Sequence, residues 1–299
     1  MAFLRGWGAV AVLLAAAAWL SPAEARAFPN EPNSLDEGAN AHSKRFQLLG
    51  ELAFFAGGIE GDAKARLLSP LFELRLQLAK HWLLDAAWGL SYVNLDGQDD
   101  ADNSFRAGNP WVAFYYQGVK GQFSYRFGLG VTIPVARLPD EGVTQAQLTA
   151  ATAYALAARV RGNTMYWLWD PHSVSVIFPM AFERRKPSGF LWGADLAAGV
   201  MLKISDRNPN QRHDAVIQMG AMMGYQAVKW LRVGARFTLV ILPKIPEQRT
   251  QLAVEPYLRF GSDDAFGSLG VVINLDNPGG FAFDKDQVWG LLFGGGAAF

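Results

Sequence analysis

The chain has 299 residues, no cysteine and a formal net charge of zero, and 51% of its residues are hydrophobic. The lack of cysteine excludes disulfides, a thiol nucleophile and Cys-ligated zinc. There is no basic tract and no Gly-rich phosphate loop before a helix, so nucleotide and nucleic-acid binding have no support. We therefore expect no nucleic-acid partner, no cofactor and no bound metal.

The beginning of the chain fits a secretory signal peptide. Arg5 supplies the positive charge, and the apolar run 7–20 is shorter than the roughly 20 residues that a membrane-spanning helix needs. The small-residue pattern Ala25-Arg26-Ala27 predicts cleavage after residue 27, with an uncleaved anchor as the alternative. Residues 28–45 are rich in Asn, Pro, Glu and Ser without periodicity, which predicts a periplasmic lead-in.

From residue 46 onward, apolar and polar residues alternate. Phe123, Tyr125 and Phe127, for example, alternate with Ser124 and Arg126, as in a strand with one apolar and one wet face. Twelve such strands are predicted, at 46–58, 68–80, 83–94, 109–117, 122–134, 174–183, 190–203, 214–227, 230–242, 250–260, 265–275 and 288–299. Since no uninterrupted apolar span follows residue 27, a membrane protein with this sequence would cross as strands.

The lengths of the connections support a barrel. Short turns are predicted near residues 81, 119, 186, 228 and 263, and long loops at 59–67, 95–107, 135–173, 204–213, 243–249 and 276–287. Strict alternation of short periplasmic turns and long extracellular loops is typical of membrane barrels. We therefore predict an all-β, up-and-down transmembrane antiparallel barrel over residues 46–299, with a soluble β-sandwich as the alternative.

The loop 135–173 is too long to be an ordinary connection. Its Ala-rich, uncharged stretch 144–158 predicts a helix, which would narrow or plug the lumen if it folds inward. The alternative is a hairpin formed by 150–160 and 165–169, turning at Gly162-Asn163, which would give fourteen strands. If the helix limits the bore, deletion of 144–158 should raise conductance.

With the apolar face toward lipid, five acidic residues and five arginines face inward. They are Glu51, Glu73, Arg75, Asp85, Arg126, Asp195, Arg232, Arg236, Glu255 and Arg259. One interpretation is that these charges pair and stiffen the wall. The other is that they line a pore and set its selectivity. Twelve strands lie between packed eight-stranded barrels and open sixteen-stranded porins, which allows a narrow channel.

Several aromatic residues are predicted near strand ends, where they would form interfacial girdles. They are Trp82, Tyr92, Trp111, Tyr115, Tyr116, Trp192, Tyr225 and Trp230. The alternative is that aromatic residues simply favour strands.

Enzymatic function has little support. His172 near Asp170 and His213 beside Asp214 are the only histidine–carboxylate pairs in extracellular loops, and neither lies in a recognisable motif. We expect no enzyme, with a rim hydrolase as the third hypothesis.

The last strand carries a resemblance. Trp289, Leu291, Phe293 and Phe299 alternate with small residues up to the final aromatic, although Gly295 interrupts the pattern. This is similar to the C-terminal signal of Gram-negative outer-membrane β-barrels. The resemblance implies an outer-membrane location, contact with membrane lipid, and the barrel assembly machinery as a partner.

A second resemblance is local. Gly108-Asn109-Pro110 before a strand, together with residues 127–134 (FGLGVTIP), is similar to a pattern in outer-membrane transporters of the phenol-degradation type. No binding residues are carried over from it. The leading expectation is passive or weakly selective passage of a small solute, and the alternative is a closed structural or surface-contact barrel without a pore.

Overall fold

A computed structural model describes residues 46–59, 64–96, 102–139, 145–184, 189–204, 213–243, 250–262, 264–275 and 288–299. The predicted signal peptide and lead-in, residues 1–27 and 28–45, lie outside these ranges and stay predictions.

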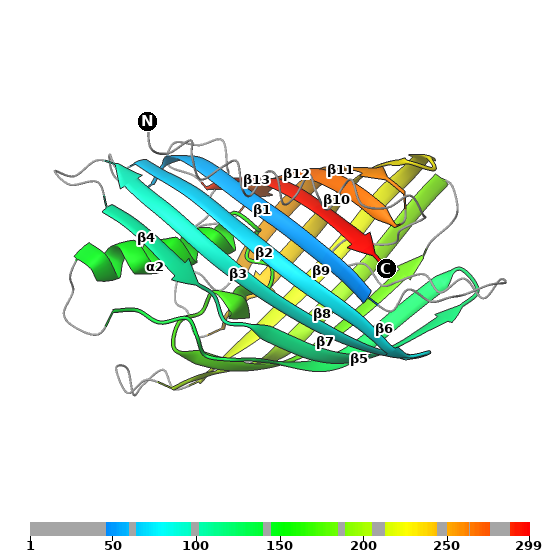
Figure 1. Ribbon diagram of the computed structural model, residues 1–299, viewed down its shortest axis with the longest axis horizontal. Helices are drawn as coiled ribbons and strands as arrows, with labels where there is room; N and C mark the ends of the chain where they lie inside the picture. Colours follow the sequence, from blue (N-terminus) through cyan, green and yellow to red (C-terminus); the bar gives the residue numbers. More distant parts are fainter. Residues whose placement is uncertain are drawn as a thin grey trace.

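The described chain forms one antiparallel sheet of 13 strands. They are β1 (Phe46–Gly58), β2 (Lys64–Ala79), β3 (Trp82–Asp96), β4 (Asp102–Ala107), β5 (Trp111–Lys120), β6 (Phe123–Thr132), β7 (Ser173–Arg184), β8 (Gly189–Lys203), β9 (His213–Val228), β10 (Leu231–Ile241), β11 (Thr250–Gly261), β12 (Ala265–Asn274) and β13 (Trp289–Ala298). Pairing of β1 with β13 and of β2 with β3 closes a barrel of 12 strands (Figure 1). Closure gives every wall strand two partners and removes the exposed sheet edges. All twelve predicted strands are confirmed.

The thirteenth strand, β4, corrects the predicted loop 95–107. It pairs with β3 from Leu90↔Ala107 to Leu95↔Asp102, and β5 pairs with the preceding part of the same strand. β4 and β5 are therefore one line of chain, broken at residues 108–110, where Pro110 lacks the N–H that a ladder needs. The sequence of β4, DNSFRA, is short and mostly polar, so it shows no clear alternation of apolar and polar residues.

The two faces of the wall have opposite character. Phe72 and Leu129 are 52% and 55% exposed on the outside, whereas Arg75 and Glu183 are each 1% exposed on the inside. Apolar residues outside and polar residues inside are the arrangement expected of a barrel in lipid. The soluble-sandwich alternative is wrong. Separately, no helix in the described residues is long and apolar enough to cross a membrane.

The chain termini of the barrel meet at one of its ends, which we call the terminal end. The Phe299 N–H donates to the Phe46 carbonyl at 2.8 Å, and the two rings lie 6.0 Å apart. The opposite end, where the helix α2 (Gln145–Arg159) lies beside β4, is called the plug end (Figure 1).

The helix prediction for 144–158 is confirmed, and the hairpin alternative is wrong. α2 packs against β2, β3 and β4, and a short 3-10 helix, η1 (Tyr166–Leu168), follows it. Gly162 and Asn163 have φ angles of 63° and 58°, so they reverse the chain after the helix rather than join two strands. The wall therefore has twelve strands and not fourteen.

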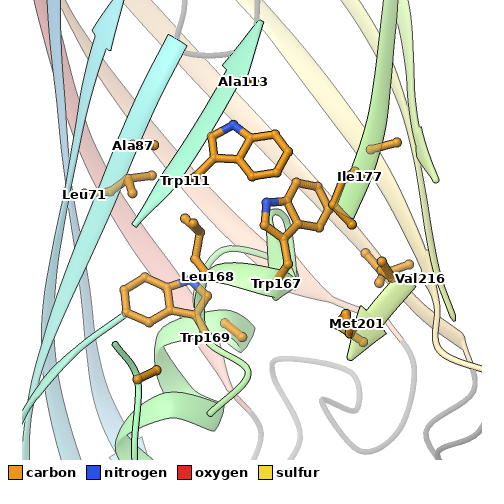
Figure 2. Close-up of a cluster of buried hydrophobic side chains, with 14 of the residues drawn as sticks. Leu71, Ala87, Trp111, Ala113, Trp167, Leu168, Trp169, Ile177, Met201 and Val216 are labelled. Carbon is orange, nitrogen blue, oxygen red and sulfur yellow. The ribbon is translucent and has the colours of Figure 1, made fainter. Parts of the chain in front are cut away.

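Two apolar clusters fill the lumen around these helices. One joins Trp111 of the wall to Trp167, Leu168 and Trp169 of η1 and its flank (Figure 2). The other joins Ala153, Leu156 and Val160 to residues of β1, β2, β3, β11, β12 and β13.

The predicted aromatic girdle needs one correction. Trp111 and Tyr115 are 2% and 5% exposed and face the lumen, because odd-numbered residues of β5 point inward. Trp82, Tyr225 and Trp230 remain exposed on the outside.

Candidate functional site

The candidate site is the lumen and the segment inside it. We call residues 133–139 and 145–172 the plug; they follow β6 and precede β7. The Trp167 ring lies 5.5 Å from that of Trp111, with the rings tilted. The guanidinium of Arg161 lies 5.3 Å from the centre of the Trp169 ring, within cation–π range. Aromatic contacts thus occupy the middle of the barrel.

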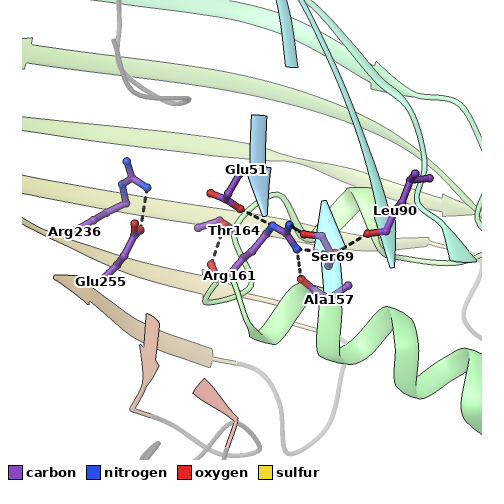
Figure 3. Close-up of polar contacts among 8 residues, drawn as sticks. All are labelled: Glu51, Ser69, Leu90, Ala157, Arg161, Thr164, Arg236 and Glu255. Carbon is purple, nitrogen blue, oxygen red and sulfur yellow. Dashed lines mark hydrogen bonds and ion pairs between the residues drawn. The ribbon is translucent and has the colours of Figure 1, made fainter. Parts of the chain in front are cut away.

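Arg161 connects the plug to the wall. Its Nε donates to Glu51 Oε1 at 2.7 Å, and its Nη1 donates to Ser69 Oγ at 2.9 Å and to Ala157 O at 3.1 Å (Figure 3). Ser69 in turn donates to the Leu90 carbonyl at 2.7 Å, so β1, β2 and β3 meet at this residue. Burial lowers the pKa of Arg161, and the Glu51 carboxylate opposes that shift. The ion pair keeps a buried charge compensated.

Asn109 holds the other side of the plug. Its Nδ2 donates to Trp167 O at 3.2 Å and to Asp170 O at 2.8 Å, and its Oδ1 accepts from the Ala136 N–H at 2.8 Å. One fully buried side chain therefore satisfies three plug backbone groups. It occupies the break between β4 and β5.

Further polar contacts attach the plug around the wall. Gln218 of β9 accepts from the Met165 N–H at 2.8 Å, and Asn274 of β12 donates to the Arg159 carbonyl at 2.9 Å. On β3, Ser91 Oγ donates to Ala153 O at 3.0 Å. The Tyr154 hydroxyl donates toward Ala107 O at 3.2 Å, and burial raises its pKa, which keeps it a neutral donor.

The ten charges predicted from sequence lie on the inward face of the described wall, and several of them take part in ion pairs that hold the lumen together. Arg75 binds Glu73 at 3.0 Å and Asp85 at 3.2 Å. Arg236 binds Glu255 at 3.0 Å, directly across neighbouring strands, and Glu51 binds Arg161 of the plug. These pairs support the interpretation that lumen charges stiffen the wall.

The remaining four are Arg126, Asp195, Arg232 and Arg259. Arg126 lies 5.1 Å from the centre of the Tyr115 ring and Arg259 lies 4.2 Å from that of Phe266. Arg232 Nε donates to Gln226 Oε1 at 3.0 Å. Asp195 is hydrogen-bonded by Gln218. That these residues line a conducting pore stays a prediction.

Two small cavities flank the tip of the plug. The larger, about 50 Å³, lies against β2, β3, β5, β6, β7, β8 and β9. The smaller, about 20 Å³, lies against β1, β2, β10, β11 and β13. Glu73 and Met165 line both cavities. The lumen is therefore not completely filled beside the plug.

The histidine–carboxylate pairs behave as structural residues where they are described. His172 Nε2 accepts from the Leu138 N–H at 2.9 Å, and Asp170 pairs with Lys203 of β8. The first contact joins the two parts of the plug, and the second fixes the end of the plug to the wall. The side chain of His213 lies outside the described part of the structure.

Sequence reasoning missed the roles of Arg161, which lies outside every predicted strand, and of Asn109, which it placed at the start of the predicted strand 109–117. The available signals were weak: a single arginine after an uncharged helix, and an asparagine between Gly108 and Pro110. Only the fold shows that both reach into one lumen.

A closed barrel with an apolar outer band defines an outer-membrane β-barrel, located in the outer membrane of a Gram-negative bacterium. No family model and no curated protein matches the chain.

Solved structures do match. An outer membrane channel from Pseudomonas putida F1 is 10% identical with a TM-score of 0.53, covering 88% of this chain and 100% of that one. The NanC porin is 8% identical with a TM-score of 0.47 (85% and 98% covered), and the beta domain of the Bordetella autotransporter BrkA is 10% identical with a TM-score of 0.48 (86% and 100% covered). The match to the Pseudomonas putida channel, at 10% identity, shows a similar fold and no more.

Proposed function

We propose that this barrel is a gated channel that gives a small solute passive or weakly selective passage across the outer membrane. The observation that carries the proposal is that the wall closes through twelve strands without using the plug. The plug is one segment between two neighbouring strands, and cavities remain beside its tip. A displaced plug would therefore leave the wall intact.

The contacts that hold the plug are suited to reversible opening. Arg161, Asn109 and Gln218 hold it through polar groups that water can satisfy when the lumen opens. The inward charges of the wall would then face the solute and set a transverse field. His172 and Asp170 are engaged in holding the plug, so we propose passage rather than catalysis.

The test is single-channel conductance in planar bilayers, using protein isolated from outer membranes. Two variants are compared with the parent protein: one with residues 145–159 replaced by a short Gly/Ser linker, and Arg161→Gln. We expect small or rare openings for the parent protein, larger steps for the linker variant and more frequent openings for Arg161→Gln. A shift in gel mobility between unheated and heated samples verifies that each barrel is folded.

The alternative is a closed structural or surface-contact barrel, and the buried tryptophan cluster around Trp111 favours it. It predicts that the parent protein and both folded variants are silent. That result would reject the channel.

We also infer that the barrel assembly machinery recognises the strand ending at Phe299. The side chain of Phe299 is exposed at the end of β13 and is therefore accessible to such a partner. The outer-membrane lipid contacts the apolar band around the wall.

A further inference from the structure

A groove on the outer face of the wall lies close to the terminal end, and we call it the outer groove. Residues of β3, β5 and β6 line it: Trp82, Phe114, Tyr116, Phe127, Gly128 and Leu129. Its volume is about 350 Å³, and nearly all of its lining is apolar. It shares no lining residue with the two cavities of the lumen, so it is a feature of the lipid-facing surface.

Packed aromatic rings give the outer groove its shape. The Trp82 ring is stacked on that of Phe114, with their centres 4.8 Å apart, and it meets the Tyr116 ring edge-on at 5.3 Å. The Tyr116 ring lies 5.3 Å from that of Phe127. Because each ring packs against another, closing the groove would break favourable aromatic contacts.

The outer groove runs from the level of the lipid headgroups into the hydrocarbon. Trp82 begins β3 and is paired with Tyr116, and Trp and Tyr are typical of the membrane interface. Phe114 and its partner Leu129 lie two residues further along the wall, about 7 Å deeper. A lipid acyl chain takes the same direction in a bilayer.

The turns at the headgroup side of the outer groove are basic. Lys80 lies two residues before Trp82, Lys120 lies four residues beyond Tyr116, and both lysines are exposed. Neither ammonium group pairs with a carboxylate of the described residues. Of the acidic side chains at this end of the wall, Asp85 and Glu183 are 5% and 1% exposed and face the lumen. The exposed lysines therefore complement an anionic headgroup.

His81 holds the turn that carries Lys80 against β5. Its Nδ1 lies 3.1 Å from the Gln117 carbonyl oxygen, and because a carbonyl only accepts, Nδ1 is the donor. The Gln117 N–H donates to the His81 carbonyl at 2.9 Å, and the His81 ring is stacked on that of Tyr116 at 5.5 Å. Lys80 is therefore held beside a residue that lines the groove.

We propose that the outer groove binds one acyl chain of an anionic phospholipid, with the phosphate of that lipid at the turns that carry Lys80 and Lys120. The lipid belongs to the leaflet at the terminal end of the barrel. The site lies outside the lumen, so the proposal does not depend on whether the barrel conducts.

The experiment is native mass spectrometry of the full purified and delipidated protein, titrated with phosphatidylglycerol or with phosphatidylcholine of the same acyl chains. We expect phosphatidylglycerol to bind more tightly, because each lysine near an anionic headgroup contributes about a factor of five. Inorganic phosphate at the same concentration should not displace the lipid. Equal affinity for the two lipids, or displacement by phosphate alone, would overturn the proposal.

Replacement of the lysines tests the headgroup side of the site. Lys80→Gln should lower the preference for phosphatidylglycerol about fivefold, and adding Lys120→Gln should remove the rest. The control is Lys229→Gln, since Lys229 is also exposed but lies in the turn between β9 and β10. An equal loss of preference in the control, or no loss in the double variant, would reject this site.

Leu129→Trp tests the acyl-chain side by filling the outer groove. It should weaken the binding of both lipids about fivefold or more, because the chain loses its apolar contact. Leu258→Trp places the same side chain on the exposed face of β11 and should leave binding unchanged. Unchanged binding by a folded Leu129→Trp variant, or equal weakening by Leu258→Trp, would show that the chain does not lie in the groove.

Discussion

The two ends of the lumen differ in what the wall presents to it. At the plug end, Ala53 and Phe55 of β1 and Leu67 of β2 point inward, and all are buried against the plug. At the terminal end, the inward residues include Gln117 and Glu183, which are polar. At these positions of β1 and β2 the wall is therefore apolar on both faces, whereas at the terminal end it is apolar on one face. Loss of alternation marks contact with an internal partner.

The largest effect should come from removing an inward aromatic residue at the plug. Trp111→Ala empties space against Trp167 and should lower the free energy of unfolding by about 3–5 kcal/mol. Phe114→Ala, on the outward face of the same strand, should cost much less because lipid refills the space. Denaturant titration of both variants in lipid vesicles checks the difference, and equal losses would contradict the assigned faces.

The strands could be predicted because alternation, turn residues and connection lengths all indicated the same arrangement. The inward direction of the charged side chains could be predicted from the same alternation. Arg75 follows Leu74 and Asp85 follows Leu84, so each charged side chain points to the face opposite its apolar neighbour. The helix was recognisable from the Ala-rich run that became α2.

The filling of the lumen could not be predicted, because it depends on contacts between residues far apart in the chain. Arg161 reaches Ser69 and Glu51, and Asn274 reaches Arg159, only after the barrel has closed. One signal was present in retrospect: Leu52 to Phe55 are apolar on both faces, which is typical of a strand buried on both sides.

The next prediction compares an ion pair between plug and wall with an ion pair within the wall. Glu51→Gln removes the carboxylate that pairs with Arg161 of the plug, and Glu255→Gln removes the carboxylate that binds Arg236 within the wall. Each change should lower the free energy of unfolding by about 3 kcal/mol, or less where water reaches the charge. Only Glu51→Gln should raise the open probability in bilayer recordings. A similar increase for Glu255→Gln would show that general loosening of the wall, and not release of the plug, controls opening.

A smaller effect is expected from crowding the plug. A Cβ at Gly290 of β13 would collide with the carbonyl oxygen of Val160, whereas at Gly295 the nearest atom, Phe266 O, lies at 3.1 Å. Gly290→Val should cost about 1–3 kcal/mol through overpacking and make the plug accessible to protease. Gly295→Val is the control on the same strand. Protection of the plug in both variants would show that the wall can yield to the new side chain.

The smallest effect on stability should occur at the terminal end. Deletion of Phe299 removes one ring contact with Phe46 and two backbone hydrogen bonds, of 2.8 and 3.4 Å, which should cost about 1–2 kcal/mol. Recognition by the assembly machinery predicts a much larger loss of folded protein in the outer membrane. Phe293→Ala removes an exposed aromatic residue from the same strand and should not reduce assembly to that extent.

The measurement is the fraction of heat-modifiable protein in outer membranes at matched expression. Equal losses for both variants would assign the effect to strand stability, whereas a selective loss on deleting Phe299 would separate recognition of the chain end from the packing that holds the barrel closed.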